Sequence, residues 1–328
     1  MLKKDSRMPN LLPKSTFDNF IQTCTPLLKI PELEEVMRQR VKCIAENLLN
    51  FQPSVDPIEN LKNFLQRDEN FIGVVLALAN LSQKKFLRIV SAKRFSEGDF
   101  GNEWAVDRIY RKMKNDDNFA TEIATLFIEG SENLLLSEIV PDFYLDQLTL
   151  PREWNTIIRD QKVIGNVVRK KLIGEYSDLK GHYVEQLVKS KVNQIKDNYG
   201  ITFTQGQVQA MGLGKEVDLV IPSLVDPYIL IMVSYMETTS SNQTTRANEQ
   251  NEMYRKIIGE NVRYNTEKIF INIVDGAGWL ARRTDLQKIF NGCHYCLNIR
   301  TLDQLESIIF KYLPSRFYSI QQPPEIEG

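Results

Sequence analysis

The chain has 328 residues, 42% of them hydrophobic and 25% charged, and 41 basic residues balance 42 acidic ones to a net charge of −1. This composition is typical of one large or two smaller soluble domains, and it excludes a strongly charged whole-molecule surface as the basis of binding. No apolar run reaches the roughly eighteen residues of a membrane helix, and the N-terminus lacks a signal-peptide core, so we expect a cytoplasmic protein without a membrane partner.

The first half of the chain has a helical pattern. Residues 1–16 carry two prolines among lysines and are expected to form a flexible arm. The segment beginning at Pro31 has proline at a helix start, acidic residues in the first turn and apolar residues three and four positions apart. The same spacing recurs at 58–67, 70–95, 103–113 and 117–130. We therefore predict a helical subdomain over 17–160.

Two groups of basic residues stand out in this half and just after it. They are Lys84, Lys85, Arg88, Lys93 and Arg94, and then Arg169, Lys170 and Lys171. Such clusters are usually solvated helix faces, but they also suit contacts with phosphate groups. Both interpretations stay open.

In the second half, helical and strand patterns alternate. An amphipathic helix is expected from about Lys180 to Gly200 and a polar helix from about Arg246 to Ile258. Strands are expected at 217–221, 228–235, 268–274 and 296–299, with further helices after the turn at 275–279 and before the Pro-rich end of the chain. This alternation predicts a mixed α/β (α+β) core over 161–315, with helices on both faces of a mixed sheet, and a disordered tail over 316–328.

One acidic residue lies inside a strand pattern. Asp218 stands among the valines, leucine and isoleucine of the run Val217–Ile221. Burying a carboxylate among apolar side chains is costly unless a cation or a hydrogen-bond donor compensates it. Asp218 is therefore expected to bind something or to be paired with another side chain.

The motifs of this half resemble the PD-(D/E)XK type II restriction endonucleases, and the DpnII/MboI-like enzymes in particular. The resemblance covers roughly residues 165–312. It is carried by the helix with Glu185, the strand with Asp218, the strand Leu230-Ile231-Met232-Val233-Ser234-Tyr235 followed by a Ser/Thr-rich stretch, and the Asp275-Gly276-Ala277-Gly278-Trp279 turn. It implies a restriction-endonuclease-like fold, Mg²⁺-dependent hydrolysis of double-stranded DNA, a homodimer, and a bacterial or archaeal restriction-modification system with a cognate DNA methyltransferase.

Residue 232 departs from this family pattern. The resemblance implies an acid there, but the chain has Met232, whose thioether does not suit Mg²⁺. The missing carboxylate is expected from Glu185, or alternatively from Glu216, Asp226 or Glu237; otherwise Met232 inactivates the site. The last case leaves a catalytically silent DNA-binding protein on the same core, and a third alternative is an α/β scaffold with no role in nucleic-acid chemistry.

Roles for the other residues follow from the resemblance and from side-chain chemistry. Asp218 and Glu185 are the expected metal ligands, and Ser234 is expected to orient the attacking water. The polar stretch after the strand suits base edges and phosphates, although it also reads as a plain loop before a helix. The expected DNA contacts are Thr239, Ser240, Ser241, Asn242, Gln243, Thr244 and Arg246, with Lys84, Lys85, Arg88, Arg94 and Lys170.

Four cysteines do not form a disulfide framework in a chain of this size. Cys293 and Cys296, with His294 between them, have metal-ligand spacing but no second close pair. A zinc site and a pair of buried structural thiols are both compatible with this spacing. The recognition sequence of a nuclease cannot be read from the chain, because it depends on which loop side chains reach the base edges.

Overall fold

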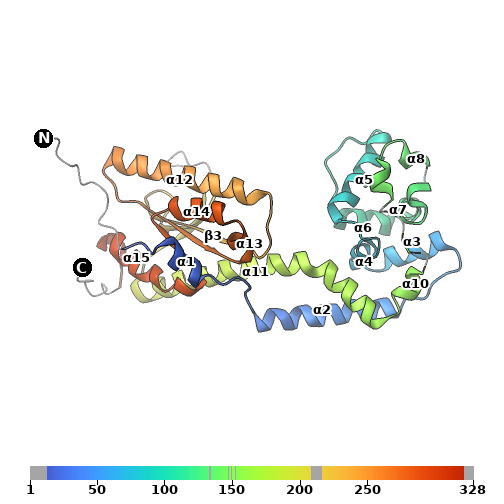
Figure 1. Cartoon of the computed structure of the whole chain (residues 1–328), viewed down its shortest axis with the longest axis horizontal. Coiled ribbons are helices and arrows are strands. Elements are labelled where there is room, and N and C mark those ends of the chain that lie inside the picture. The colour runs from blue at the N-terminus through green and yellow to red at the C-terminus, as the bar shows by residue number, and fades with distance from the viewer. Residues whose placement is uncertain are drawn as a thin grey trace. The chain divides into compact units, whose positions relative to one another are not determined.

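The computed structural model describes residues 13–320 apart from 133, 147, 149, 152 and 208–215. The chain forms two compact units. One is the helical unit Ile30–Tyr176, and the other, the sheet unit, combines the residues up to Lys29 with those from Ser177 onward. Figure 1 shows helices alone in the first and strands with helices in the second.

The helical unit is built from amphipathic helices around one core. Its longer helices are α2 (Pro31–Leu49), α3 (Pro57–Arg67), α4 (Asn70–Leu78), α5 (Gln83–Ser96), α6 (Val106–Asn115) and α7 (Asp117–Glu129). Shorter segments follow at Gly130–Glu132 (η1), Leu134–Ser137 (α8), Asp142–Leu145 (α9) and Trp154–Ile157 (α10). The rings of Phe51, Phe64, Phe71 and Trp154 pack together in its core.

The sheet unit contains one five-stranded mixed sheet in the order β1-β2-β3-β4-β5. Its strands are β1 (Thr204–Gln207), β2 (Glu216–Pro222), β3 (Pro227–Tyr235), β4 (Ile269–Asp275) and β5 (Tyr295–Leu297). The pairs β1–β2 and β2–β3 are antiparallel, and the pairs β3–β4 and β4–β5 are parallel. Strands β2 and β3 form a hairpin, in agreement with the apolar runs at 217–221 and 228–235 that predict two neighbouring strands joined by a short turn.

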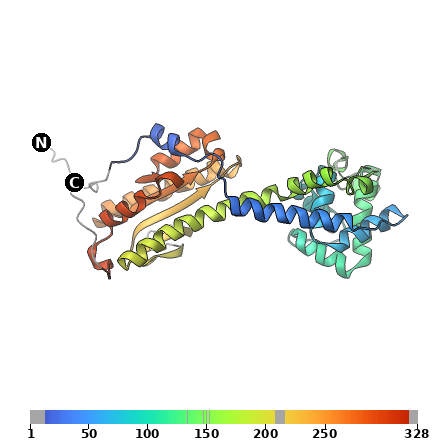
Figure 2. The ribbon, with the colours of Figure 1, turned by 90° about the horizontal axis from the view of Figure 1, so that it is seen from below.

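Helices cover both faces of this sheet. The helices of this unit are α1 (Phe17–Thr23), α11 (Gln161–Tyr199, from Ser177 onward), α12 (Asn242–Tyr264), α13 (Ala277–Ala281), α14 (Arg283–Asn291) and α15 (Gln304–Tyr312), with 3₁₀ turns η2 (Ile299–Thr301) and η3 (Ser315–Phe317). One face packs against α1, α12 and α14, and the other against α11 and α15. Figures 1 and 2 show α12 and α11 on opposite sides of the strands. The predicted mixed sheet with helices on both faces, preceded by a helical half, is confirmed.

The limits of these parts differ from the limits that the sequence suggested. Gln161–Tyr199 form one helix of 39 residues rather than a helix that begins near Lys180. Phe17 and Phe20 of α1 pack on Phe290, so this helix belongs to the sheet unit and not to a helical subdomain over 17–160.

Described residues within both of the ends that we expected to be flexible make defined contacts with the sheet unit. In the arm, Lys14 donates a hydrogen bond to the carbonyl of Cys293. At the other end, the Ser319 hydroxyl donates to the carbonyl of Gly200 at 3.0 Å, and Tyr318 packs on the sheet core. Residues 1–12 and 321–328 lie outside the described residues. None of the helices that the structure describes is long and apolar enough to span a membrane.

Candidate active site

Asp218 lies where the β2–β3 ladder ends. The paired residues run from Pro222 and Pro227 at the turn to Leu219 and Ile231, and the pairing stops before Asp218. The Asp218 carboxylate accepts the backbone N–H of Val233 at 2.7 Å, in the place where a strand partner would otherwise bond. The partner that the structure gives this acid is thus a backbone N–H rather than the side chain that the sequence suggested.

The surroundings of Asp218 disfavour its negative charge. Burial is the main reason that its pKa lies above the ordinary value, and the carboxylates of Glu185 and Glu216 raise it further. The Val233 N–H and the charge of Lys189 oppose this rise without cancelling it. An acid with a raised pKa beside other acids is a common feature of functional sites, because a cation or substrate relieves the repulsion.

A polar cavity of about 370 Å³ opens at this point. Its lining comes from α11, both strands of the hairpin and α12: Glu185, Glu216, Asp218, Met232, Val233, Ser234, Arg246, Glu249, Gln250 and Met253. The structure thus brings together Asp218, Glu185, Met232 and Ser234, which the sequence had placed on three separate elements. We refer to this cavity as the acidic pocket.

Ser234 is buried at the edge of the acidic pocket. Its hydroxyl oxygen accepts the indole N–H of Trp279 at 3.1 Å, so the side chain is held in one orientation. Met232 is half-buried in the same lining. The thioether therefore occupies the position at which the family pattern implies a carboxylate.

Glu237 does not line the acidic pocket. One of its oxygens accepts hydrogen bonds from Lys180 at 2.8 Å, from the Tyr235 hydroxyl and from the Leu28 N–H at 3.2 Å. Burial opposes the ionisation of Glu237, but the bonds from Lys180 and Tyr235 outweigh it, so its pKa lies below the ordinary value. The structure gives Glu237 a role in joining α11, β3 and the N-terminal segment.

Asp226 is also away from the acidic pocket. It lies in the β2–β3 turn, at the other end of the hairpin from Asp218, and its carboxylate is 3.5 Å from Arg316. Of the alternative acids that the sequence offered, only Glu185 and Glu216 reach the pocket.

The turn after β4 fixes the backbone path of the polar stretch that follows β3 and contains Thr239 to Arg246. The N–H of Gly278 donates to the carbonyl of Met236 at 2.8 Å. A Cβ at Gly276 would lie 2.2 Å from the Met236 oxygen, and one at Gly278 would lie 2.4 Å from the Thr238 oxygen. Two glycines are needed because the backbones approach this closely. The glycine-bearing turn therefore supports the segment that leads into α12.

The residues of the polar stretch fall into two groups. Thr239, Ser241, Asn242 and Arg246 are exposed. Gln243 is fully buried and accepts the Ser240 N–H, while the Thr244 hydroxyl donates to Asp285 at 2.8 Å. Only the first group is free to reach a nucleic acid without rearrangement.

The predicted DNA contacts of the helical unit also divide. Lys84 and Arg88 are exposed, and they line a cavity of about 480 Å³ together with Lys85, whose ammonium group lies 5.2 Å from the Tyr144 ring centre. Arg94, by contrast, is 4% exposed and is held between Asp99 and the face of Trp104. Arg94 is a structural residue of this unit because its guanidinium group is already used inside the fold.

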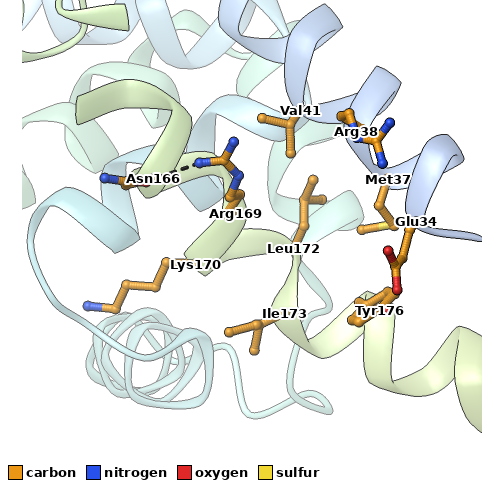
Figure 3. Close-up of a pocket in the computed structure, with 10 residues that line it drawn as sticks. All are labelled: Glu34, Met37, Arg38, Val41, Asn166, Arg169, Lys170, Leu172, Ile173 and Tyr176. Atoms are coloured by element: carbon orange, nitrogen blue, oxygen red, sulfur yellow. Dashed lines mark hydrogen bonds between the residues drawn. The ribbon is translucent and has the colours of Figure 1, made fainter. Parts of the chain in front are cut away.

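Lys170 lies beside a second cavity of the helical unit, with a volume of about 610 Å³ (Figure 3). Apolar side chains of α2 and of the first part of α11 make most of its lining: Met37, Val41, Leu172, Ile173 and Tyr176. Lys170 itself donates to Asn80 at 2.7 Å, and Arg169 donates to Asn166 at 3.1 Å. This cavity is suited to apolar contacts and offers little for hydrolytic chemistry.

Cys293, Cys296 and His294 are all buried. The Nδ1 atom of His294 accepts the Phe270 N–H at 2.9 Å, and burial with the nearby Lys14 lowers the pKa of His294 to about 4. Throughout the described residues, no three His, Cys, Asp or Glu side chains are close enough together to hold a metal ion. The arrangement favours the structural interpretation of these thiols over a zinc site.

The acidic pocket fits a hard divalent cation in the chemistry of its donors. Glu185, Glu216, Asp218 and Glu249 offer carboxylate oxygens, which Mg²⁺ prefers. Gln250 adds a buried amide oxygen, for which the described part of the chain offers no hydrogen-bond partner. These acids do not form a ready three-ligand site, in line with the missing acid at Met232.

Sequence reasoning missed Glu249 and Gln250. Both follow Arg246 at spacings of three and four residues, which place all three side chains on one face of α12. That spacing was the available signal, but it does not show which face of a polar helix turns toward the sheet.

A model of the DpnII restriction endonuclease family matches residues 159–307, a range that contains the whole sheet and every residue of the acidic pocket. Comparison with curated proteins and with solved structures gave no match.

Proposed function

We propose, from the match of residues 159–307 to the DpnII restriction endonuclease family, that the protein is a type II restriction endonuclease that cleaves double-stranded DNA with Mg²⁺ at the acidic pocket. The observation that carries the proposal is the meeting of Asp218 and Glu185, from a strand and a helix, in one cavity within the matched range. The charge of Glu185 acts directly on the pKa of Asp218, so the two carboxylates are electrostatically coupled.

Cleavage of a phosphodiester requires a water molecule in line with the leaving oxygen. A bound Mg²⁺ would lower the pKa of water and neutralise the negative charge that builds on the phosphoryl group. Asp218 and Glu185 bind the cation in this proposal. Ser234, held by Trp279, uses its own hydroxyl proton to orient the attacking water. Arg246, exposed at the rim of the pocket, contacts a phosphate of the DNA.

Met232 weakens this site in the proposal, because the thioether contributes no ligand where the family pattern implies a carboxylate. The same observation supports the alternative function, which is sequence-specific DNA binding without cleavage. DNA contacts come from Thr239, Ser241, Asn242 and Arg246, and from Lys84, Lys85, Arg88 and Lys170 of the helical unit. A homodimer on a palindromic target, and a cognate methyltransferase that protects the cytoplasmic DNA of the host, complete the proposal.

Met232→Glu tests the proposal. Unmethylated phage DNA is incubated with Mg²⁺ and either the parent, Met232→Glu, Asp218→Asn or the double variant, and the fragments are separated by electrophoresis. We expect Met232→Glu to give discrete fragments at a rate on the order of a hundredfold above the parent, because it restores a cation ligand and transition-state stabilisation. Asp218→Asn abolishes cleavage in both backgrounds.

Val262→Glu is the control, since it adds a carboxylate at an exposed position of α12 outside the lining of the acidic pocket and leaves cleavage unchanged. A folded Met232→Glu protein that binds DNA but never cuts it would favour the silent DNA-binding alternative. Absence of any duplex affinity at low salt would remove both functions.

A further inference from the structure

One face of α12 is aimed at the acidic pocket. Arg246, Glu249, Gln250 and Met253 recur at spacings of three, four and seven residues, and all four line the cavity. Ala247, Met253 and Ile257 of the same helix pack on the sheet face that carries Val220, Leu230 and Met232. The packing of α12 therefore fixes this row of side chains beside the residue at which the family pattern is broken.

Gln250 is the unusual member of this row. Its side chain is 5% exposed, and its buried amide oxygen has no hydrogen-bond partner among the residues that the structure describes. Most buried polar atoms in folded proteins are paired, and an unpaired one costs about 1–3 kcal/mol. An apolar residue would fill the same space without that cost, so the oxygen calls for a functional explanation.

We propose that Gln250 supplies an oxygen ligand to a divalent cation bound at Asp218, and that it substitutes for the carboxylate that Met232 cannot provide. This inference rests on the proposed function, because it uses the same cation site. An amide oxygen is a hard ligand of the kind that Mg²⁺ and Mn²⁺ accept, whereas a thioether is not.

The charge in the pocket explains why a neutral ligand fits. Glu185, Glu216, Asp218 and Glu249 already line the cavity, and two of these acids disfavour ionisation of Asp218. A further carboxylate would increase this repulsion in the absence of a cation. Gln250 adds a ligand oxygen without adding charge, so repulsion among the carboxylates of the pocket does not increase in the absence of a cation.

Binding of Mn²⁺ tests the assignment without relying on DNA cleavage. The full chain is titrated with Mn²⁺, and free Mn²⁺ is measured by electron paramagnetic resonance. We expect Gln250→Met, which keeps the length of the side chain and removes its oxygen, to weaken Mn²⁺ binding by about tenfold or more. Gln250→Glu tightens binding by a similar factor, because it replaces the neutral oxygen by a carboxylate.

Two controls separate this ligand role from a structural one. Asn248→Leu removes an amide from an exposed position of α12 outside the pocket lining and leaves Mn²⁺ binding unchanged. Gln250→Met also keeps or raises the midpoint of thermal unfolding, because the oxygen that it removes has no partner to lose. In the Met232→Glu background, Gln250→Met has a smaller effect on binding, since the carboxylate at 232 takes over the ligand position.

The outcomes distinguish the inference from the function on which it rests. Loss of Mn²⁺ binding in Asp218→Asn, with binding unchanged in Gln250→Met, overturns the role of Gln250 and leaves the nuclease proposal standing. No Mn²⁺ binding by the parent, Gln250→Glu or Met232→Glu overturns both.

Discussion

Two aspartates of the same sheet, Asp218 on β2 and Asp275 at the end of β4, are buried in different ways. Asp275 accepts three backbone N–H groups, from Thr25, Gly276 and Ile299, at 2.6, 2.8 and 3.1 Å. Asp218 accepts one, from Val233, and otherwise faces a cavity that contains more acids. Burial raises the pKa of both carboxyls, but neighbouring N–H groups and Arg300 counteract it at Asp275, whereas Glu185 and Glu216 add to it at Asp218.

The different hydrogen bonding of these two aspartates shows that a buried acid is not by itself evidence of a reactive site. Asp275 joins β4 to the segments around Thr25 and Ile299, so its charge serves the fold. Asp218 has lone pairs left over in a place where other acids repel it. At the proposed site, a bound cation would make this charge favourable.

The largest expected effect on stability comes from removing Asp275. Asp275→Ala leaves three backbone N–H groups without their acceptor, and we expect the free energy of unfolding to fall by about 3–5 kcal/mol. Urea denaturation of the full chain measures this loss. Asp218→Ala is the matched comparison and loses less than 1 kcal/mol on this view, by roughly the cost of one hydrogen bond. Equal losses in the two variants would break the distinction between them.

A second effect concerns the pair Lys180 and Glu237. Both side chains are largely buried, so Lys180→Met leaves the Glu237 carboxylate with only Tyr235 and Leu28 as donors. We expect a loss of about 2–3 kcal/mol in the free energy of unfolding, because an uncompensated buried charge remains. Mn²⁺ affinity stays at the parent value, since Glu237 is outside the acidic pocket. A large drop in Mn²⁺ affinity would return Glu237 to the list of candidate ligands.

The pH dependence of stability sharpens the contrast further. Because the folded-state pKa of Asp218 is raised above its ordinary value of 3.8, the folded protein holds that proton to a higher pH than the unfolded chain. The contribution of this group to stability is therefore lost as the pH rises from about 4 through the raised pKa. Asp218→Asn keeps the acceptor for Val233 but removes the titration.

Unfolding of Asp218→Asn and of the parent by urea at several pH values checks this sign. We expect the free energy of unfolding of Asp218→Asn to increase relative to that of the parent as the pH rises across that window, by on the order of 1 kcal/mol at neutral pH. A variant that instead loses stability relative to the parent at neutral pH would show that the Asp218 charge is well compensated in the free protein.

The smallest expected effect is at Gly181, in the interior of α11. An added Cβ there meets no atom within 4 Å. Gly181→Ala should raise the free energy of unfolding by about 0.5–1 kcal/mol, because alanine loses less backbone entropy in a helix. Thermal unfolding measures the gain. A loss of stability would indicate that α11 does not continue through this position.

The elements that local patterns determine could be predicted from the sequence. The two neighbouring apolar runs Val217–Ile221 and Tyr228–Tyr235 predict the hairpin. Asp218 stands out because it is an acid within an apolar strand. Helix α11 could not be delimited in this way, because Gly174 and Gly181 lower the local helix propensity, yet the helix continues through both residues. Local propensity is a weak guide where tertiary packing decides.

The parts of the site that depend on long-range packing could not be predicted. Nothing near Glu237 in the sequence shows that Lys180 and Leu28 will bind it. The burial of Gln250 depends on how α12 sits on the sheet, and the docking of α1 depends on the contact of Phe17 and Phe20 with Phe290. Residue types alone did not single out Glu185; the family resemblance pointed to it, and the structure places it in the lining of the acidic pocket.

The most direct test of the central claim is to locate the bound cation in the full chain. Fe²⁺ is added in place of Mg²⁺ with ascorbate and peroxide, and the sites of backbone cleavage are read by mass spectrometry. We expect backbone cuts next to Asp218, Met232 and Gln250. Excess Mg²⁺ suppresses these cuts, and Asp218→Asn lacks them. Cuts confined to other parts of the chain, such as Cys293–Cys296, or cuts that persist in Asp218→Asn, would contradict it.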